Sequence, residues 1–138
     1  MKLLAIPALL LAALVSTPAE AKLKVFACEP EWGSLVQELA GDKVDVDVAT
    51  TALQDVHVVE AKPSLIAKVR SADLVVCTGA ELEVGWLPQL IRQSGNTKVA
   101  SGPGSFMAAM QVKTLEKPTA LDRANGDVHP DGNPHVQM

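Results

Sequence analysis

Aromatic residues are scarce in this sequence, making up 3% of its 138 residues, and tyrosine is absent. A groove that stacks sugars or nucleobases needs several aromatic faces, so the composition argues against both ligand classes. Positive charge is also in deficit, because 12 Lys and Arg residues stand against 16 Asp and Glu residues. The formal net charge of −4 argues against a nucleic-acid partner, which would bind a basic face.

Long apolar runs are equally rare, and the longest one, residues 3–15, lies at the N-terminus. It is too short for a bilayer span, which takes about 20 residues. Lys2 precedes it, and the small-residue pattern Ala19-Glu20-Ala21 follows it. This order is typical of a secretory signal peptide cleaved after Ala21, although an uncleaved anchor or a buried helix would fit the run as well. Cleavage would leave residues 22–138, enough for one domain.

Beyond the N-terminus, short apolar runs alternate with segments of helical periodicity. We expect strands at 23–28, 44–48, 73–77 and 98–100, helices at 30–40, from Pro63 and at 81–93, and a further short strand at 111–115. The alternation predicts an α/β fold, a parallel-sheet lobe with helices on both faces. Ligands of such sheets bind at the carboxyl ends of the strands. The long loop 50–62 leaves the carboxyl end of the second strand and is therefore a candidate functional edge.

The three histidines, His57, His129 and His135, all fall in predicted loops. Neutral imidazole is the commonest side-chain metal ligand, so all three are candidate ligands. His57 stands between Asp55 and Glu60, and such a carboxylate could orient the imidazole ring by accepting its second N–H. The alternative is an ordinary solvated polar loop, because spacing alone shows no short zinc signature such as H-E-x-x-H.

Two longer strings carry a family resemblance. Residues 51–64 (TALQDVHVVEAKPS) and 126–135 (GDVHPDGNPH) resemble the first and second ligand loops of the metal-binding proteins that serve zinc and manganese ABC importers. Residues 23–41 fit that family's first strand and helix, and residues 72–87 fit its third strand and the helix that follows. The resemblance therefore covers nearly all of the chain beyond the signal peptide.

The resemblance implies two α/β lobes joined by a long helix, with the metal in the cleft between them. His57 and His135 would be ligands from the first lobe, and His129 an auxiliary ligand. The implied protein is a periplasmic monomer that captures Zn²⁺, with Mn²⁺ as the alternative cargo, for the membrane permease of an ABC importer. The sequence stops three residues after His135, without the second lobe, so we expect a truncated N-terminal lobe with a half-site that binds metal weakly.

Two other functions compete with metal transport. A metal-dependent hydrolase could hold zinc on His57 and His135 and use Glu60 as general base, although no nucleophile motif supports an enzyme. A thiol-based redox module could use Cys28 and Cys77, which lack the C-x-x-C spacing. If the first and third strands are neighbours, these cysteines could form a disulfide, but we favour two buried free thiols.

Overall fold

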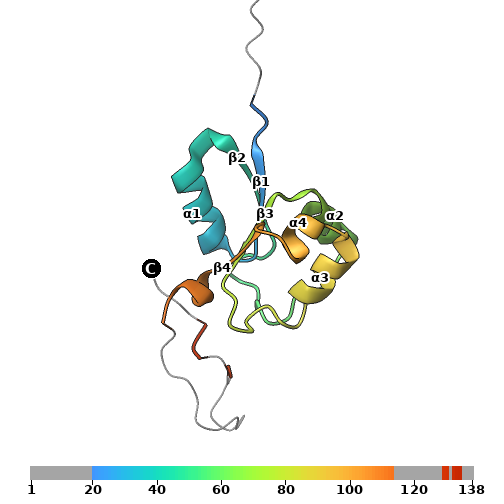
Figure 1. Cartoon of the computed structure of the whole chain (residues 1–138). Coiled ribbons are helices and arrows are strands. Elements are labelled where there is room, and N and C mark those ends of the chain that lie inside the picture. The colour runs from blue at the N-terminus through green and yellow to red at the C-terminus, as the bar shows by residue number, and fades with distance from the viewer. Residues whose placement is uncertain (1–19, 114–128, 131, 135–138) are drawn as a thin grey trace, which may run out of the picture.

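The computed structural model describes residues 20–113, 129–130 and 132–134 (Figure 1). Most of the predicted signal peptide, and His135, lie outside these described residues. Within the described part of the chain, no helix has both the length and the apolar character needed to cross a bilayer.

Four parallel strands form the central sheet, in the order β2-β1-β3-β4. Their bounds are Leu23–Ala27 for β1, Val44–Val48 for β2, Leu74–Cys77 for β3 and Ser105–Met107 for β4. The first three strands were predicted from their apolar, β-branched runs. Because β1 pairs with both β2 and β3, it occupies an interior position and is the scaffold on which the other strands align.

The helices cover both faces of this sheet. They are α1 (Pro30–Ala40), α2 (Pro63–Ser71), α3 (Leu87–Ser94) and α4 (Thr97–Ala100), with short 3-10 turns η1 (Gly41–Lys43) and η2 (Ala108–Gln111). Figure 1 shows α1 on one side of the strands and α2, α3 and α4 on the other. The predicted fold class, a parallel-sheet α/β lobe with helices on both faces, is confirmed.

Side-chain alternation along β1 produces two separate cores. Val25 belongs to the cluster on the α1 side, where Trp32 also packs. Phe26 and Cys28 belong to the other cluster, with Leu90 of α3. Successive strand residues point to opposite faces, so a stretch buried on both sides must be apolar, as residues 25–27 of β1 are.

The helix predicted at 81–93 begins later, at Leu87. Pro88 lies in its first turn, where a missing N–H costs nothing, so the proline starts this helix and does not kink it. The preceding residues Gly79, Ala80 and Glu81 have φ values of 79°, 51° and 68°. Left-handed backbone at three successive positions is incompatible with a right-handed helix, and it turns the chain sharply after β3.

The predicted strand at 98–100 is wrong, because these residues lie in helix α4. Asn96 caps that helix, its Oδ1 accepting a hydrogen bond from the Lys98 amide at 3.0 Å. The fourth strand is instead β4, which pairs with β3. The strand predicted at 111–115 is also wrong over its described part, since Gln111 ends η2 and residues 112–113 belong to no strand.

The strand order reverses around β1. The chain crosses from β1 to β2 on one side of it, and then to β3 on the other side. In open parallel sheets such a reversal leaves a crevice outside the carboxyl ends of the two diverging strands, where ligands commonly bind. Cys28 follows the end of β1 and Cys77 ends β3, so both cysteines lie at this switch point.

Candidate metal centre

The loop after β2 carries His57, and Asp55 orients it. The Asp55 Oδ1 atom accepts hydrogen bonds from the His57 backbone N–H at 2.9 Å and from the His57 Nδ1 at 2.8 Å. Both bonds lower the pKa of Asp55, the backbone bond contributing most. A proton placed on Nδ1 by the carboxylate leaves the lone pair on Nε2, which is the nitrogen a metal would then bind.

The same loop is anchored to the protein beside α3. The indole Nε1 of Trp86 donates a 2.8 Å hydrogen bond to the Val56 carbonyl oxygen, and the Trp86 side chain is almost completely buried. A Cβ atom at Gly85 would lie 3.1 Å from the His57 carbonyl oxygen, so glycine permits the close approach of the two loops. The backbone on both sides of the His57 α-carbon is therefore fixed against residues 85–86.

His129 meets His57 from far along the chain. The two Nε2 atoms lie 3.4 Å apart, and the rings stack with centroids 5.4 Å apart and planes inclined by 25°. A turn holds His129, because its carbonyl oxygen accepts the Gly132 amide at 3.1 Å. We call His57 and His129 the histidine pair. The structure thus brings two of the three predicted histidines together.

The separation of the two Nε2 atoms suits a single bound ion. Zinc–nitrogen bonds of about 2.05 Å at a tetrahedral angle place two imidazole nitrogens roughly 3.3 Å apart. The observed 3.4 Å matches this spacing. His135 lies outside the described residues, but Pro134, directly before it, is fully buried. The two Nε2 atoms are therefore close enough together to contact one cation.

Glu60, the general base of the competing hydrolase interpretation, lies differently. Its Oε2 is 4.0 Å from the Lys62 Nζ, and its side chain is 80% exposed. Asp55, and not Glu60, holds the His57 ring.

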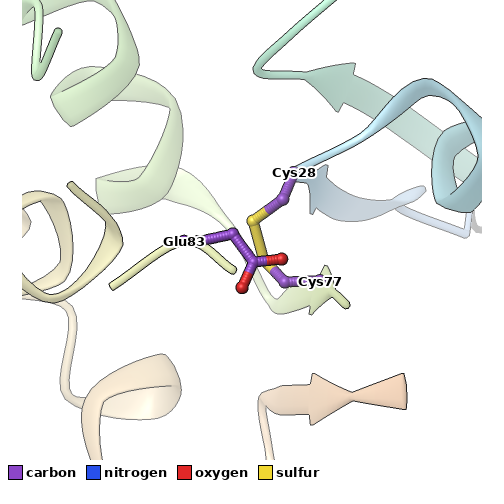
Figure 2. Close-up of side chains that lie close together, drawn as sticks. All are labelled: Cys28, Cys77 and Glu83. Atoms are coloured by element: carbon purple, nitrogen blue, oxygen red, sulfur yellow. A yellow bond between two sulfur atoms is a disulfide. The ribbon is translucent and has the colours of Figure 1, made fainter. Parts of the chain in front are cut away.

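The two cysteines form a disulfide, so the preference for free thiols is wrong. Their Cα atoms are 4.9 Å apart, and Cys28 and Cys77 come from the adjacent strand ends of β1 and β3. Figure 2 shows the Glu83 side chain reaching toward this disulfide from its own loop. One ligand atom from each of Cys28, Cys77 and Glu83 can be chosen so that all three lie within 4.8 Å of one another.

Two buried carboxyl groups lie beside the disulfide, and the sequence reasoning missed both. Glu83 Oε1 accepts the Thr78 amide at 2.9 Å, and Glu29 Oε2 accepts the same amide at 3.3 Å. Burial, and then the charge of Glu83, raises the pKa of Glu29 to about 8. Burial also raises the pKa of Glu83. Near neutral pH the two carboxyls therefore share a proton, since two adjacent buried charges are unfavourable.

A sequence signal for these carboxyls did exist. Glu29 lies two residues beyond the end of the first strand, and Glu83 lies six residues beyond the end of the third. The carboxyl ends of parallel strands meet at one edge, so charged residues just beyond two neighbouring strands are candidates for a shared site. We refer to Cys28, Cys77, Glu29 and Glu83 as the thiol–carboxyl cluster.

Solved structures share this fold. The Mn-bound periplasmic metal binding protein from Candidatus Liberibacter asiaticus aligns with a TM-score of 0.62 and 23% sequence identity, over 83% of this chain and 38% of that chain. The chain is therefore of the class of α/β lobes found in periplasmic metal-binding proteins.

The chain matches the family described as zinc-uptake complex component A periplasmic (ZnuA) over residues 25–138, and it belongs to that family. The manganese ABC transporter substrate-binding lipoprotein PsaA of Streptococcus pneumoniae is 32% identical over 85 residues, 59% of this chain and 28% of that protein. The iron ABC transporter substrate-binding lipoprotein MtsA of Streptococcus pyogenes is 32% identical over 80 residues, 56% of this chain and 26% of that protein. The chain thus spans less than a third of these relatives, and the resemblance seen in the sequence is confirmed.

Proposed function

We propose that this chain captures a divalent metal ion outside the cytoplasm and delivers it, as a monomer, to the permease of an ABC importer. The observation that carries the proposal is the histidine pair, with its Nε2 atoms 3.4 Å apart and the His57 ring held by Asp55. Membership of a family described as periplasmic and zinc-uptake supports both the cargo and the location. The predicted signal peptide, residues 1–21, would direct the export.

Within this proposal each histidine has a role. His57 and His129 bind the ion through Nε2, and His135 is a further ligand from the loop that the buried Pro134 anchors. Asp55 positions His57 without touching the metal. Residues 22–138 act as an N-terminal lobe, and a second lobe would supply the remaining ligands. On its own the lobe leaves coordination positions to water, so its affinity should lie below that of a closed four-ligand site.

Zinc is the preferred cargo in this proposal because the available donors are imidazole nitrogens. Manganese favours carboxylate, carbonyl and water oxygens, whereas imidazole suits zinc. PsaA and MtsA are named for manganese and iron, so the family as a whole spans several metals. Competition between Zn²⁺ and Mn²⁺ for the purified chain checks this preference. Equal or tighter binding of Mn²⁺ would contradict it.

Calorimetric titration of the chain with Zn²⁺ tests the function itself. Replacing His57 with alanine should weaken binding at least tenfold, about 1.4 kcal/mol, because one ligand is lost. His129→Ala and His135→Ala should each weaken binding too. Glu60→Gln is the matched control, since it removes an exposed carboxylate from the same loop. Unchanged affinity in His57→Ala, or an equal loss in Glu60→Gln, would overturn the proposed site.

A further inference from the structure

The thiol–carboxyl cluster has no part in the proposed capture of metal by the histidine pair. It lies at the switch point between β1 and β3, where α/β sheets of this type bind ligands. Cys28 and Cys77 have no exposed surface, and Glu83 is 3% exposed. Two sulfur atoms and a carboxylate oxygen within 4.8 Å of one another are ligand types that zinc and related cations accept.

Backbone amides hold Glu83 in place, and Figure 2 shows its carboxyl group close to the disulfide. Its two oxygens accept the Gly79 N–H at 3.2 and 3.0 Å, and Oε1 also accepts the Thr78 N–H. Glu83 further lines a surface pocket of about 240 Å³, together with Glu81, Val84, Leu87 and Pro88. Glu83 therefore belongs both to the lining of this pocket and to the group of ligand atoms that includes the two sulfur atoms.

Glu29 is a second buried carboxyl group, next in sequence to Cys28. Its side chain is 4% exposed, and its Oε2 accepts hydrogen bonds from both the amide and the hydroxyl of Thr78. Among the described residues, its Oε1 is a buried oxygen that no N–H or hydroxyl donor reaches. A proton shared with Glu83 would satisfy this atom, and so would a bound cation. A buried oxygen without a hydrogen-bond donor, on the residue that follows Cys28, is consistent with a ligand of positive charge.

We propose that reduction of the Cys28–Cys77 disulfide opens a second, buried cation site, in which the two thiolates and Glu83 bind a thiophilic divalent ion such as Zn²⁺ or Cd²⁺. Reduction by a water-soluble phosphine breaks the Sγ–Sγ bond. The phosphine and one water become the phosphine oxide, and each cysteine gains a thiol proton. The cation then displaces both protons and binds the thiolates. Reoxidation to the disulfide removes both sulfur ligands and closes the site.

Cd²⁺ is the probe, because cadmium–thiolate bonds give a charge-transfer band in the ultraviolet. The full chain is titrated in its disulfide form and again after phosphine reduction. The band should appear only in the reduced chain, with about one Cd²⁺ per chain. His57→Ala should keep the band while losing metal binding in the disulfide form. The experiment therefore distinguishes the two sites, and it shows which of the two proposals has failed if one does.

Glu83→Gln should weaken Cd²⁺ binding by the reduced chain at least tenfold, whereas Glu81→Gln, an exposed carboxylate on the same turn, should leave it unchanged. Alkylation of Cys28 and Cys77 should slow in the presence of Cd²⁺. Circular dichroism reports whether the reduced chain stays folded. Absence of the band in a folded reduced chain would overturn the proposal. A fold lost on reduction and not restored by Cd²⁺ would overturn it as well, because no site would then exist.

Discussion

The histidine pair and the thiol–carboxyl cluster both contain metal-binding side-chain types, yet their surroundings differ. The His57 side chain is 30% exposed and is held by one loop carboxylate, whereas both cysteines are completely buried and covalently joined. In the proposed function the pair contributes metal ligands, whereas the cluster in its disulfide form contributes stability to the lobe. A site for exchangeable cargo needs access to solvent, while a covalent crosslink acts best within a core.

Removal of the disulfide should have the largest effect and should separate the two regions most clearly. The crosslink joins residues 49 positions apart, and the entropy of closing a loop of that length corresponds to about 4 kcal/mol of unfolding free energy. We expect Cys28→Ala combined with Cys77→Ala to lower the urea midpoint accordingly. His57→Ala should change the free energy of unfolding by less than about 0.5 kcal/mol, because His57 lies in a partly exposed loop. Equal losses of unfolding free energy in the two variants would contradict the stabilising role of the disulfide relative to the histidine pair.

The pH dependence of stability should report the cluster. Glu29 has a pKa of about 8 in the folded chain and 4.5 when unfolded, so the folded state holds a proton that the unfolded state releases. The free energy of unfolding should therefore fall as pH rises from about 4.5 to 8 and level off above. Glu29→Gln should flatten this fall and stabilise the chain at pH 9 by on the order of a few kcal/mol.

Urea unfolding between pH 4.5 and 9 measures this effect, with Glu31→Gln, an exposed glutamate in α1, as the control. Asp55 and Asp73 have lowered pKa values, so their contributions are lost below about pH 4, outside the window. A Glu29→Gln profile that still falls as in the parent chain would show that Glu29 does not retain the proton.

Asp55→Ala should act on the pair alone. Without the carboxylate the His57 ring loses its orienting bond, and changes to such partners typically weaken metal affinity 10- to 100-fold, about 1.4–2.7 kcal/mol. Zinc titration measures the loss. Asp42→Ala, an exposed aspartate in η1, is the control. Retained affinity in Asp55→Ala would mean that the loop backbone alone orients the ring.

The two tryptophans offer the finest comparison, because each links one region to the core. Trp86→Phe removes the bond to the Val56 carbonyl, and Trp32→Phe removes the bond from the Trp32 Nε1 to the Thr78 hydroxyl. Each should cost about 1 kcal/mol of unfolding free energy. Only Trp86→Phe should also weaken zinc binding, by loosening the His57 loop. A parallel loss of zinc affinity in Trp32→Phe would show that the regions are coupled.

Local patterns in the sequence determined the first three strands, α1 and the start of α2, because buried strands and amphipathic helices are readable from their own residues. The alternation of apolar strand runs with amphipathic helices already implied a sheet covered on both faces, as the two cores show. The late start of α3 at Leu87 could not be predicted from apolar periodicity, because it depends on the left-handed backbone of the preceding turn. The short β4 was also missed, since its pairing with β3 defines it more than its composition does.

Only the tertiary structure decided which side chains meet. The sequence named His57 and His129 as candidate ligands, but their 3.4 Å contact joins residues 72 positions apart. It likewise left the cysteines open between free thiols and a disulfide, and the adjacency of β1 and β3 resolved the question. The Glu29–Glu83 carboxyl pair arises from the same adjacency. Residue type and local periodicity are properties of a segment, whereas a site is a property of segments brought together by the sheet.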